Sequence, residues 1–170
     1  MAVRERKSLP RRDAMLLVVD AQNLYYSARE LYGKGSRIDF LRLKEKIVGE
    51  RVFGAVYGVA FVPVIRDDTA SLAKALKRLG YEILERSERF DAQVRELERL
   101  MGSYSVLAVA SGSGDFLPLY RVVREQQKKV EVYSFADAAN GEIPQNSDSF
   151  IKLDLTVLMG DYSTVDALKG

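Results

Sequence analysis

The sequence predicts a three-layer α/β/α domain built around a mainly parallel sheet. Short apolar runs rich in β-branched residues punctuate the chain, as in AMLLVV (14–19) and VLAVA (106–110). Stretches with the apolar spacing of amphipathic helices alternate with these runs. Strands buried on both faces have continuous apolar sequences, because helices cover both sides of a parallel sheet. The alternation therefore predicts a Rossmann-like layered fold.

Each element follows from this pattern. Strands are predicted at 14–19, 53–64, 81–84, 106–110, 130–135 and 150–153. Helices are predicted at 24–31, 38–47, 69–79, 90–101 and 115–128. Neither a repeat nor a linker separates these elements, so we expect one domain over 13–155, a basic tail over 1–12 and an unplaced C-terminal tail over 156–170.

The composition excludes several kinds of chemistry. The chain of 170 residues has no cysteine and no histidine, which rules out disulfides, thiolate metal sites and catalysis by imidazole. Carboxylates that hold a hard divalent cation are the natural alternative. The net charge is only +2, and no apolar run approaches the roughly 20 residues that cross a bilayer. Without a secretory signal pattern at 1–12, we expect a cytoplasmic protein that does not enter a membrane.

Three acids stand out by their positions. Asp20 ends the first predicted strand, Asp115 lies in the turn SGSGD after the strand at 106–110, and Asp91 opens a helix. Ligands of open α/β sheets bind at the carboxyl ends of parallel strands, so chemistry is expected at Asp20 and Asp115. Each acid could instead be a helix N-cap, most readily Asp91. A dinucleotide site is disfavoured, because DAQN follows the first strand in place of a GxGxxG turn. Gln22 likewise interrupts the DxD pattern of aspartyl phosphatases.

Three segments together resemble a known family. VVDAQNLYYSAR, SGSGDFLPLYRVVREQQKKVEVYS and NSDSFIKLD are similar to the opening, central and closing motifs of NYN domains, the LabA-like branch of the PIN nuclease superfamily. The resemblance extends over about 15–154 and implies a PIN-like fold. It also implies a ribonuclease that hydrolyses RNA phosphodiester bonds with Mg²⁺ or Mn²⁺.

The resemblance also implies roles for individual residues. Asp20, Asp91 and Asp115 would be catalytic and, with Asp148, would bind the metal ion in an acidic pocket. Substrate-binding roles fall to Asn23, Ser111, Ser113 and Tyr26. We expect single-stranded RNA as the partner, since Tyr25 and Tyr26 could offer a stacking face to an unpaired base, although at least one of the two rings should belong to the core. The oligomeric state, a homodimer among the options, is left open.

Two departures from the family pattern support a second hypothesis. Ser113 stands where the family has an aspartate, and Leu97 replaces a second acid in the helix that follows Asp91, with Glu96 and Glu98 beside it. A catalytically degenerate module for RNA binding or assembly is therefore the alternative function.

Overall fold

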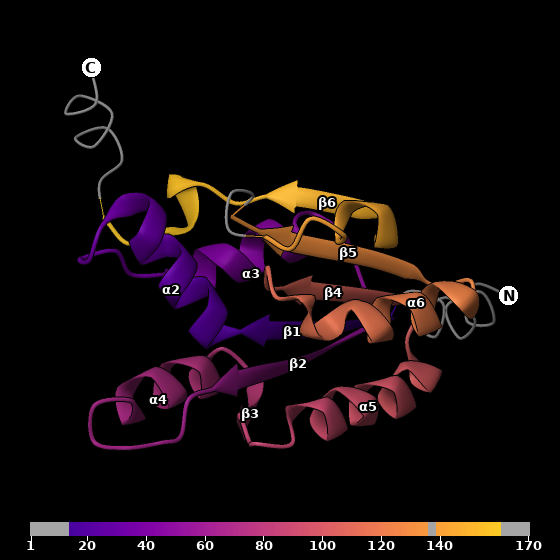
Figure 1. The fold of residues 1–170 in the computed structure, drawn as a ribbon, viewed down its shortest axis with the longest axis horizontal. Coiled ribbons are helices and arrows are strands. Elements are labelled where there is room, and N and C mark those ends of the chain that lie inside the picture. The colour runs from indigo at the N-terminus through magenta and orange to yellow at the C-terminus, as the bar shows by residue number, and fades with distance from the viewer. Residues whose placement is uncertain (1–13, 136–138, 161–170) are drawn as a thin grey trace, which may run out of the picture.

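The computed structural model describes residues 14–135 and 139–160 and has a six-stranded parallel sheet in the order β3-β2-β1-β4-β5-β6 (Figure 1). The strands are β1 (Ala14–Asp20), β2 (Ala55–Val62), β3 (Tyr81–Glu85), β4 (Val106–Ala110), β5 (Lys129–Ser134) and β6 (Ser149–Lys152). The helices are α2 (Ala21–Tyr32), α3 (Phe40–Val48), α4 (Ala70–Arg78), α5 (Phe90–Leu100) and α6 (Leu117–Glu125). The predicted α/β/α fold class is confirmed.

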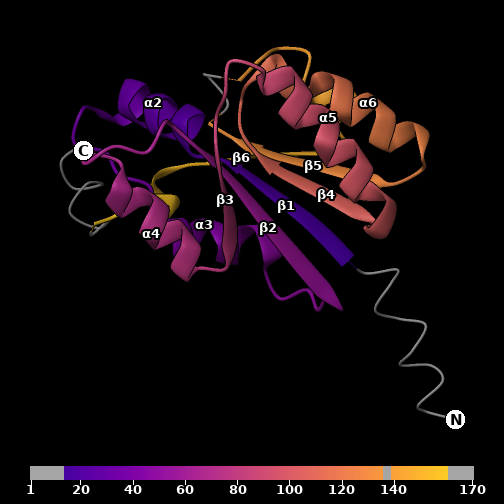
Figure 2. The same ribbon diagram turned by 90° about the horizontal axis from the view of Figure 1, so that it is seen from below.

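Strand β1 organises the core because its side chains alternate between two helical layers. Met15, Leu17 and Val19 pack in one apolar cluster with residues of α2, α3 and α4. Leu16 and Val18 pack in the other cluster with residues of α5 and α6. Figure 2 shows the two layers on opposite faces of the sheet. All seven residues of β1 are buried, as its apolar sequence predicts.

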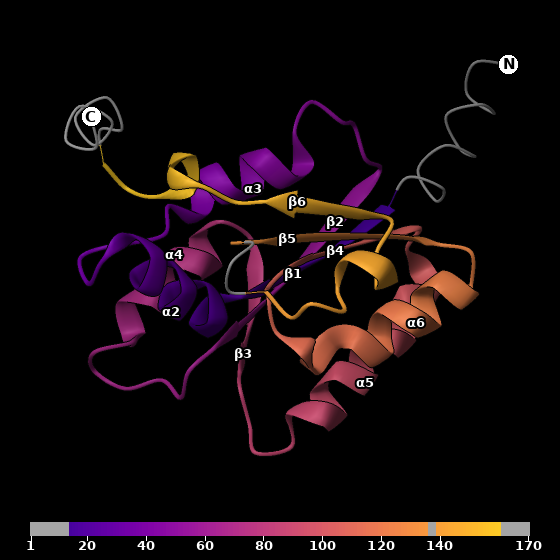
Figure 3. The same cartoon turned by 45° about the horizontal axis from the view of Figure 1, so that its top comes forward.

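The chain reverses its winding direction between β1 and β4. The helices that follow β1 and β2 cover one face of the sheet, whereas α5 and α6, which follow β3 and β4, cover the other. In Figures 1 and 3, β1 leads directly into α2, away from α5 and α6. Val19 pairs with Ala110, so Asp20 and Ser111 are the next residues on two neighbouring strands. A crevice at such a reversal is the usual ligand site of an open α/β sheet.

Several element boundaries differ from the predictions. Strand β2 is Ala55–Val62 rather than 53–64, and α6 ends at Glu125 because Gln126 is followed by Gln127 with a positive φ of 62°. No element was predicted after residue 154, yet Leu155–Val157 forms a 3₁₀ turn that buries Val157. The predicted basic tail and residues 161–170 lie outside the described residues. No helix in the described part is long and apolar enough to span a membrane.

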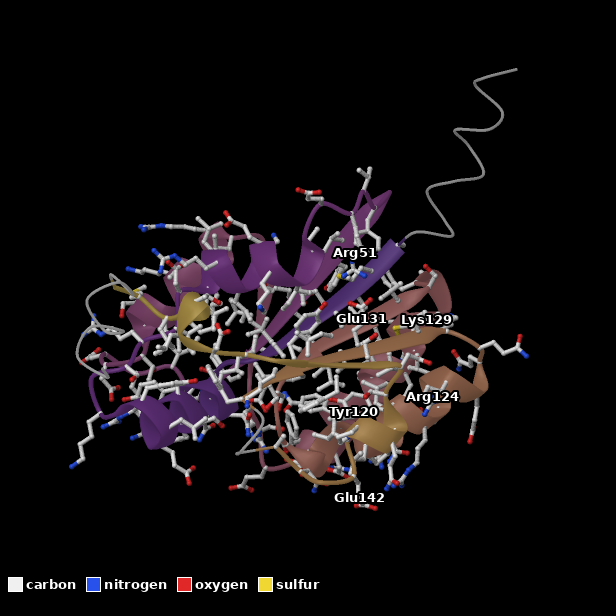
Figure 4. All side chains as sticks on the ribbon, turned by 90° about the horizontal axis from the view of Figure 1, so that it is seen from above. Arg51, Tyr120, Arg124, Lys129, Glu131 and Glu142 are labelled. Carbon is white, nitrogen blue, oxygen red and sulfur yellow. The ribbon has the colours of Figure 1, made fainter. Side chains whose placement is uncertain are left out.

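One ion pair joins the segment after α3 to the sheet. Arg51 donates from both terminal nitrogens to Glu131 of β5, at 2.6 and 2.9 Å (Figure 4). The Glu131 carboxylate also accepts a hydrogen bond from the Tyr133 hydroxyl at 3.0 Å. The Glu131 side chain therefore connects Arg51 with Tyr133.

Candidate active site at the β1–β4 crevice

Asp20 lies at the carboxyl end of β1, at the reversal point between β1 and β4, and is completely buried. As the N-cap of α2, it accepts a hydrogen bond from the Asn23 N–H at 3.3 Å through Oδ1. Its other oxygen, Oδ2, accepts from the Ser111 hydroxyl at 2.9 Å. Asp20 is thus both a helix cap and a buried carboxylate tied to the end of β4.

The turn after β4 is held by hydrogen bonds that use its small polar side chains. Asn23 Oδ1 accepts from the Gly112 N–H at 2.8 Å, which ties the turn to α2. Ser111 Oγ accepts from the Ser113 N–H at 3.1 Å, and Ser113 Oγ in turn accepts from the Asp115 N–H at 3.1 Å. Asn23 and Ser111 therefore position the turn next to Asp20, while the Ser113 hydroxyl caps the short 3₁₀ helix that starts at Gly114.

Arg86 lies between the two carboxylates, a contact that the sequence-based analysis missed. Its Nη2 donates to Asp115 Oδ2 at 2.8 Å, and its Nη1 is 3.6 Å from Asp20 Oδ2. The guanidinium carbon lies 3.9 Å from the centre of the Phe90 ring. The only sequence signal was the position of Arg86 two residues after the predicted strand at 81–84, which ends at the same edge of the sheet.

Burial dominates the electrostatics of Asp20. Loss of solvation raises the pKa of its carboxyl group, against the opposing effects of the Ser111 and Asn23 hydrogen bonds and the charge of Arg86. The Tyr120 hydroxyl is buried and has no hydrogen-bond partner among the described residues. Burial and, to a smaller extent, the charge of Asp20 raise the pKa of Tyr120.

The structure does not bring Asp91 and Asp148 into this site. Asp91 is on an exposed turn of α5, where its side chain is 70% exposed and pairs with Arg95 at 3.3 Å. Asp148 precedes β6 and accepts from the Val130 N–H at 2.8 Å, near the start of β5. In a parallel sheet the starts and ends of strands lie at opposite edges, so the predicted grouping of Asp148 with Asp20 is wrong geometrically.

Tyr25 and Tyr26 are both exposed on α2, so the expectation that one of them belongs to the core is wrong. Their rings meet edge to face with centroids 5.4 Å apart. Arg29 donates to the Tyr25 hydroxyl at 2.6 Å and lies over the same ring. Tyr26 is 59% exposed, which leaves its ring available to a base.

The donor set at the crevice suits one hydrated divalent ion. Mg²⁺ is commonly bound through one or two carboxylates and keeps several waters, and Asp20 and Asp115 supply two carboxylates. Asn23 and Ser111 add an amide and a hydroxyl oxygen beside them. No group of three or more acidic side chains converges anywhere in the described residues. An ion that used the Oδ2 atoms of both aspartates would have to take the place of the Arg86 guanidinium.

Comparisons with known proteins agree with the fold. The NYN domain model matches residues 14–154 of the chain. A protein of unknown function from Vibrio parahaemolyticus is similar in structure, with a TM-score of 0.76. The alignment covers 88% of this chain and 98% of that one at 21% identity, so the likeness concerns the fold alone. No curated protein matches the chain.

Proposed function

Because the chain belongs to the NYN domain family, within the PIN-like nuclease superfamily, we propose that it is a ribonuclease of the LabA-like branch. It would hydrolyse phosphodiester bonds of single-stranded RNA in the cytoplasm, at the edge formed by Asp20 and Asp115. The observation that carries this proposal is the convergence of the two carboxylates, which lie 3.6 and 2.8 Å from the same guanidinium, that of Arg86. The two acids, 95 positions apart in the sequence, therefore face a common point.

The proposed roles follow from the environments of the residues. Asp20 and Asp115 would hold Mg²⁺ or Mn²⁺, which when bound polarises a phosphate and activates water. Asn23 and Ser111 would act as positioning residues, because their hydrogen bonds determine where the turn and the Asp20 carboxylate lie. Ser113 would influence Asp115 through the backbone, since its hydroxyl is bonded to the Asp115 N–H.

The preference for single-stranded RNA would come from Tyr26 and its neighbour Tyr25. Unpaired bases can stack on exposed aromatic rings, whereas bases within a duplex are already stacked on each other. Both tyrosines are on α2, whose first residue directly follows Asp20. A single-stranded RNA bound across this helix would therefore pass close to the carboxylates of Asp20 and Asp115.

The test is cleavage of a fluorescently labelled single-stranded RNA with Mn²⁺, with Mg²⁺ and with EDTA. Wild-type protein should cut only with a divalent ion, and Asp20→Asn and Asp115→Asn should reduce the rate by about 100-fold or more. Asp91→Asn and Asp148→Asn are matched controls and should cut as wild type does, because both side chains lie outside the crevice. Thermal melting should confirm that every variant is folded. Cleavage that persists in EDTA or in both crevice variants would contradict the proposal.

A specific observation favours a second candidate, an RNA-binding or assembly module without nuclease activity. The two crevice carboxylates already share a cation in Arg86, and no third acid joins them in the described residues. Such a module would bind RNA in EDTA and leave it intact, with an affinity that falls as salt rises because cationic side chains displace condensed counterions. A gel shift in EDTA followed by a long incubation with Mn²⁺ distinguishes the two candidates.

A further inference from the structure

We propose that in the free protein Arg86 occupies the carboxylate pair as a resident cation, and that it moves to a phosphate when RNA binds. RNA binding would thereby open Asp20 and Asp115 to the divalent ion. This inference rests on the proposed function for the identity of the anion. The occupation of the two carboxylates by Arg86 in the free protein does not depend on that identity.

The position of Arg86 is determined by contacts on three sides. Its N–H donates to the Val62 carbonyl at 2.8 Å, which continues the pairing of β3 with β2 by one residue. Its guanidinium stacks on the Phe90 ring at 3.9 Å and donates to Asp115 at 2.8 Å. The backbone contact and the ring bring the cation to the carboxylates without help from a ligand. The fold itself therefore holds the Arg86 guanidinium at the two carboxylates.

Arg86 and a metal ion would compete for the same oxygen atoms. The guanidinium contacts the Oδ2 atom of Asp20 and the Oδ2 atom of Asp115. A divalent ion bound by these atoms would sit within a few ångströms of the guanidinium, where two cations repel strongly. Occupation by Arg86 therefore weakens metal binding in the free protein.

A phosphate can draw Arg86 away because the guanidinium is accessible from the solvent side. The Arg86 side chain is 30% exposed and its partner Asp115 is 51% exposed, whereas Asp20 is completely buried. Arginine binds phosphate through two parallel hydrogen bonds, which makes a phosphodiester a strong competitor for a guanidinium. The exchange leaves Asp20 in place and moves only the exposed part of the cluster.

The consequence is reciprocal coupling between metal and RNA. If RNA removes a competitor of the metal, then RNA must raise the affinity for the metal and the metal must raise the affinity for RNA by the same factor. Such couplings are commonly about fivefold or more. Removal of the Arg86 charge should abolish the coupling by leaving the carboxylates free at all times.

The experiment measures Mn²⁺ binding by electron paramagnetic resonance, with and without a 2′-O-methyl oligouridylate whose integrity is checked on a gel. We expect the oligonucleotide to lower the Kd of wild-type protein for Mn²⁺ by about fivefold or more. Arg86→Gln should bind Mn²⁺ more tightly than wild type without the oligonucleotide and should gain little from it. Arg86→Lys keeps the positive charge and should still weaken metal binding. Arg89→Gln removes an exposed arginine three residues away and is the matched control.

The outcomes separate this inference from the nuclease proposal. If a folded Arg86→Gln protein binds Mn²⁺ no more tightly than wild type, or if the coupling persists in it, Arg86 is not a competing cation and the inference is wrong. Cooperative binding of Mn²⁺ and oligonucleotide by a wild-type protein that cuts no RNA would refute the nuclease and support the exchange. Melting curves monitored by circular dichroism establish that each variant is folded.

Discussion

Replacement of Tyr120 by phenylalanine should make the protein more stable, although it removes a hydroxyl group from the interior. The Tyr120 hydroxyl is buried without a partner among the described residues. A buried polar group in this state costs about 1–3 kcal/mol. Tyr120→Phe leaves a void of order 10 Å³, which at about 24 cal/mol per Å³ costs roughly 0.2 kcal/mol. We therefore expect a net gain of about 1 kcal/mol.

Two other buried tyrosines provide matched controls. Tyr81 also has a buried hydroxyl without a partner among the described residues, so Tyr81→Phe should stabilise the protein as well. The Tyr133 hydroxyl, by contrast, donates to Glu131 at 3.0 Å. Tyr133→Phe should therefore destabilise the protein by about 1 kcal/mol.

Urea unfolding of the metal-free protein, followed by circular dichroism, measures these differences. With an m value of about 2 kcal/mol per M, a gain of about 1 kcal/mol raises the midpoint by roughly 0.5 M. A lower midpoint for Tyr120→Phe, in the same direction as Tyr133→Phe, would refute the reasoning. It would mean that a water molecule already satisfies the Tyr120 hydroxyl in the free protein.

Two further substitutions test the packing of the sheet. Gly58→Ala should destabilise the protein by about 1–3 kcal/mol, because a Cβ there would lie 2.7 Å from the Tyr81 ring. Gly102→Ala is the control and should be nearly neutral in urea unfolding, because a Cβ at Gly102 would meet nothing within 4 Å. Glu131→Gln should weaken the ion pair with Arg51, whose side chain is 42% exposed. We expect the melting temperature measured by calorimetry to fall by about 2–4 °C. An unchanged melting temperature would show that the pair does not stabilise the protein.

The fold could be predicted because its strongest signals are local. The apolar runs at 14–19 and 106–110 became β1 and β4, the neighbouring strands on either side of the reversal point. Asp20 and Asp115 could be placed at one edge for the same reason, since Asp20 ends β1 and Asp115 lies in the short turn after β4. In a parallel sheet the carboxyl ends of all strands lie at the same edge, so residues that follow different strands come close together.

The outcomes for Asp148, Asp91 and Arg86 could not be predicted from local sequence. They depend on which end of a strand a residue adjoins and on which side chains lie next to it in the fold. Asp148 also adjoins a strand, but it precedes β6 and therefore lies at the opposite edge. Asp91 directly follows Phe90, whose ring contacts Arg86, yet it pairs with Arg95 and is largely exposed. Arg86 was hidden in a charged segment, 66 positions after Asp20 and 29 before Asp115, and no local pattern links three residues at such separations.

The two crevice aspartates differ in a way that bears on any chemistry at this edge. Asp20 is buried and receives hydrogen bonds from Asn23 and Ser111, so its position is determined by the fold itself. Asp115 is half exposed, and among the described residues its carboxylate is paired with Arg86 alone. When Arg86 leaves, Asp115 therefore loses a partner, whereas Asp20 keeps two. Movement of the Arg86 guanidinium would therefore leave the Asp115 carboxylate without its ion pair. Asp20 would stay in place, because its hydrogen bonds to Asn23 and Ser111 do not involve Arg86.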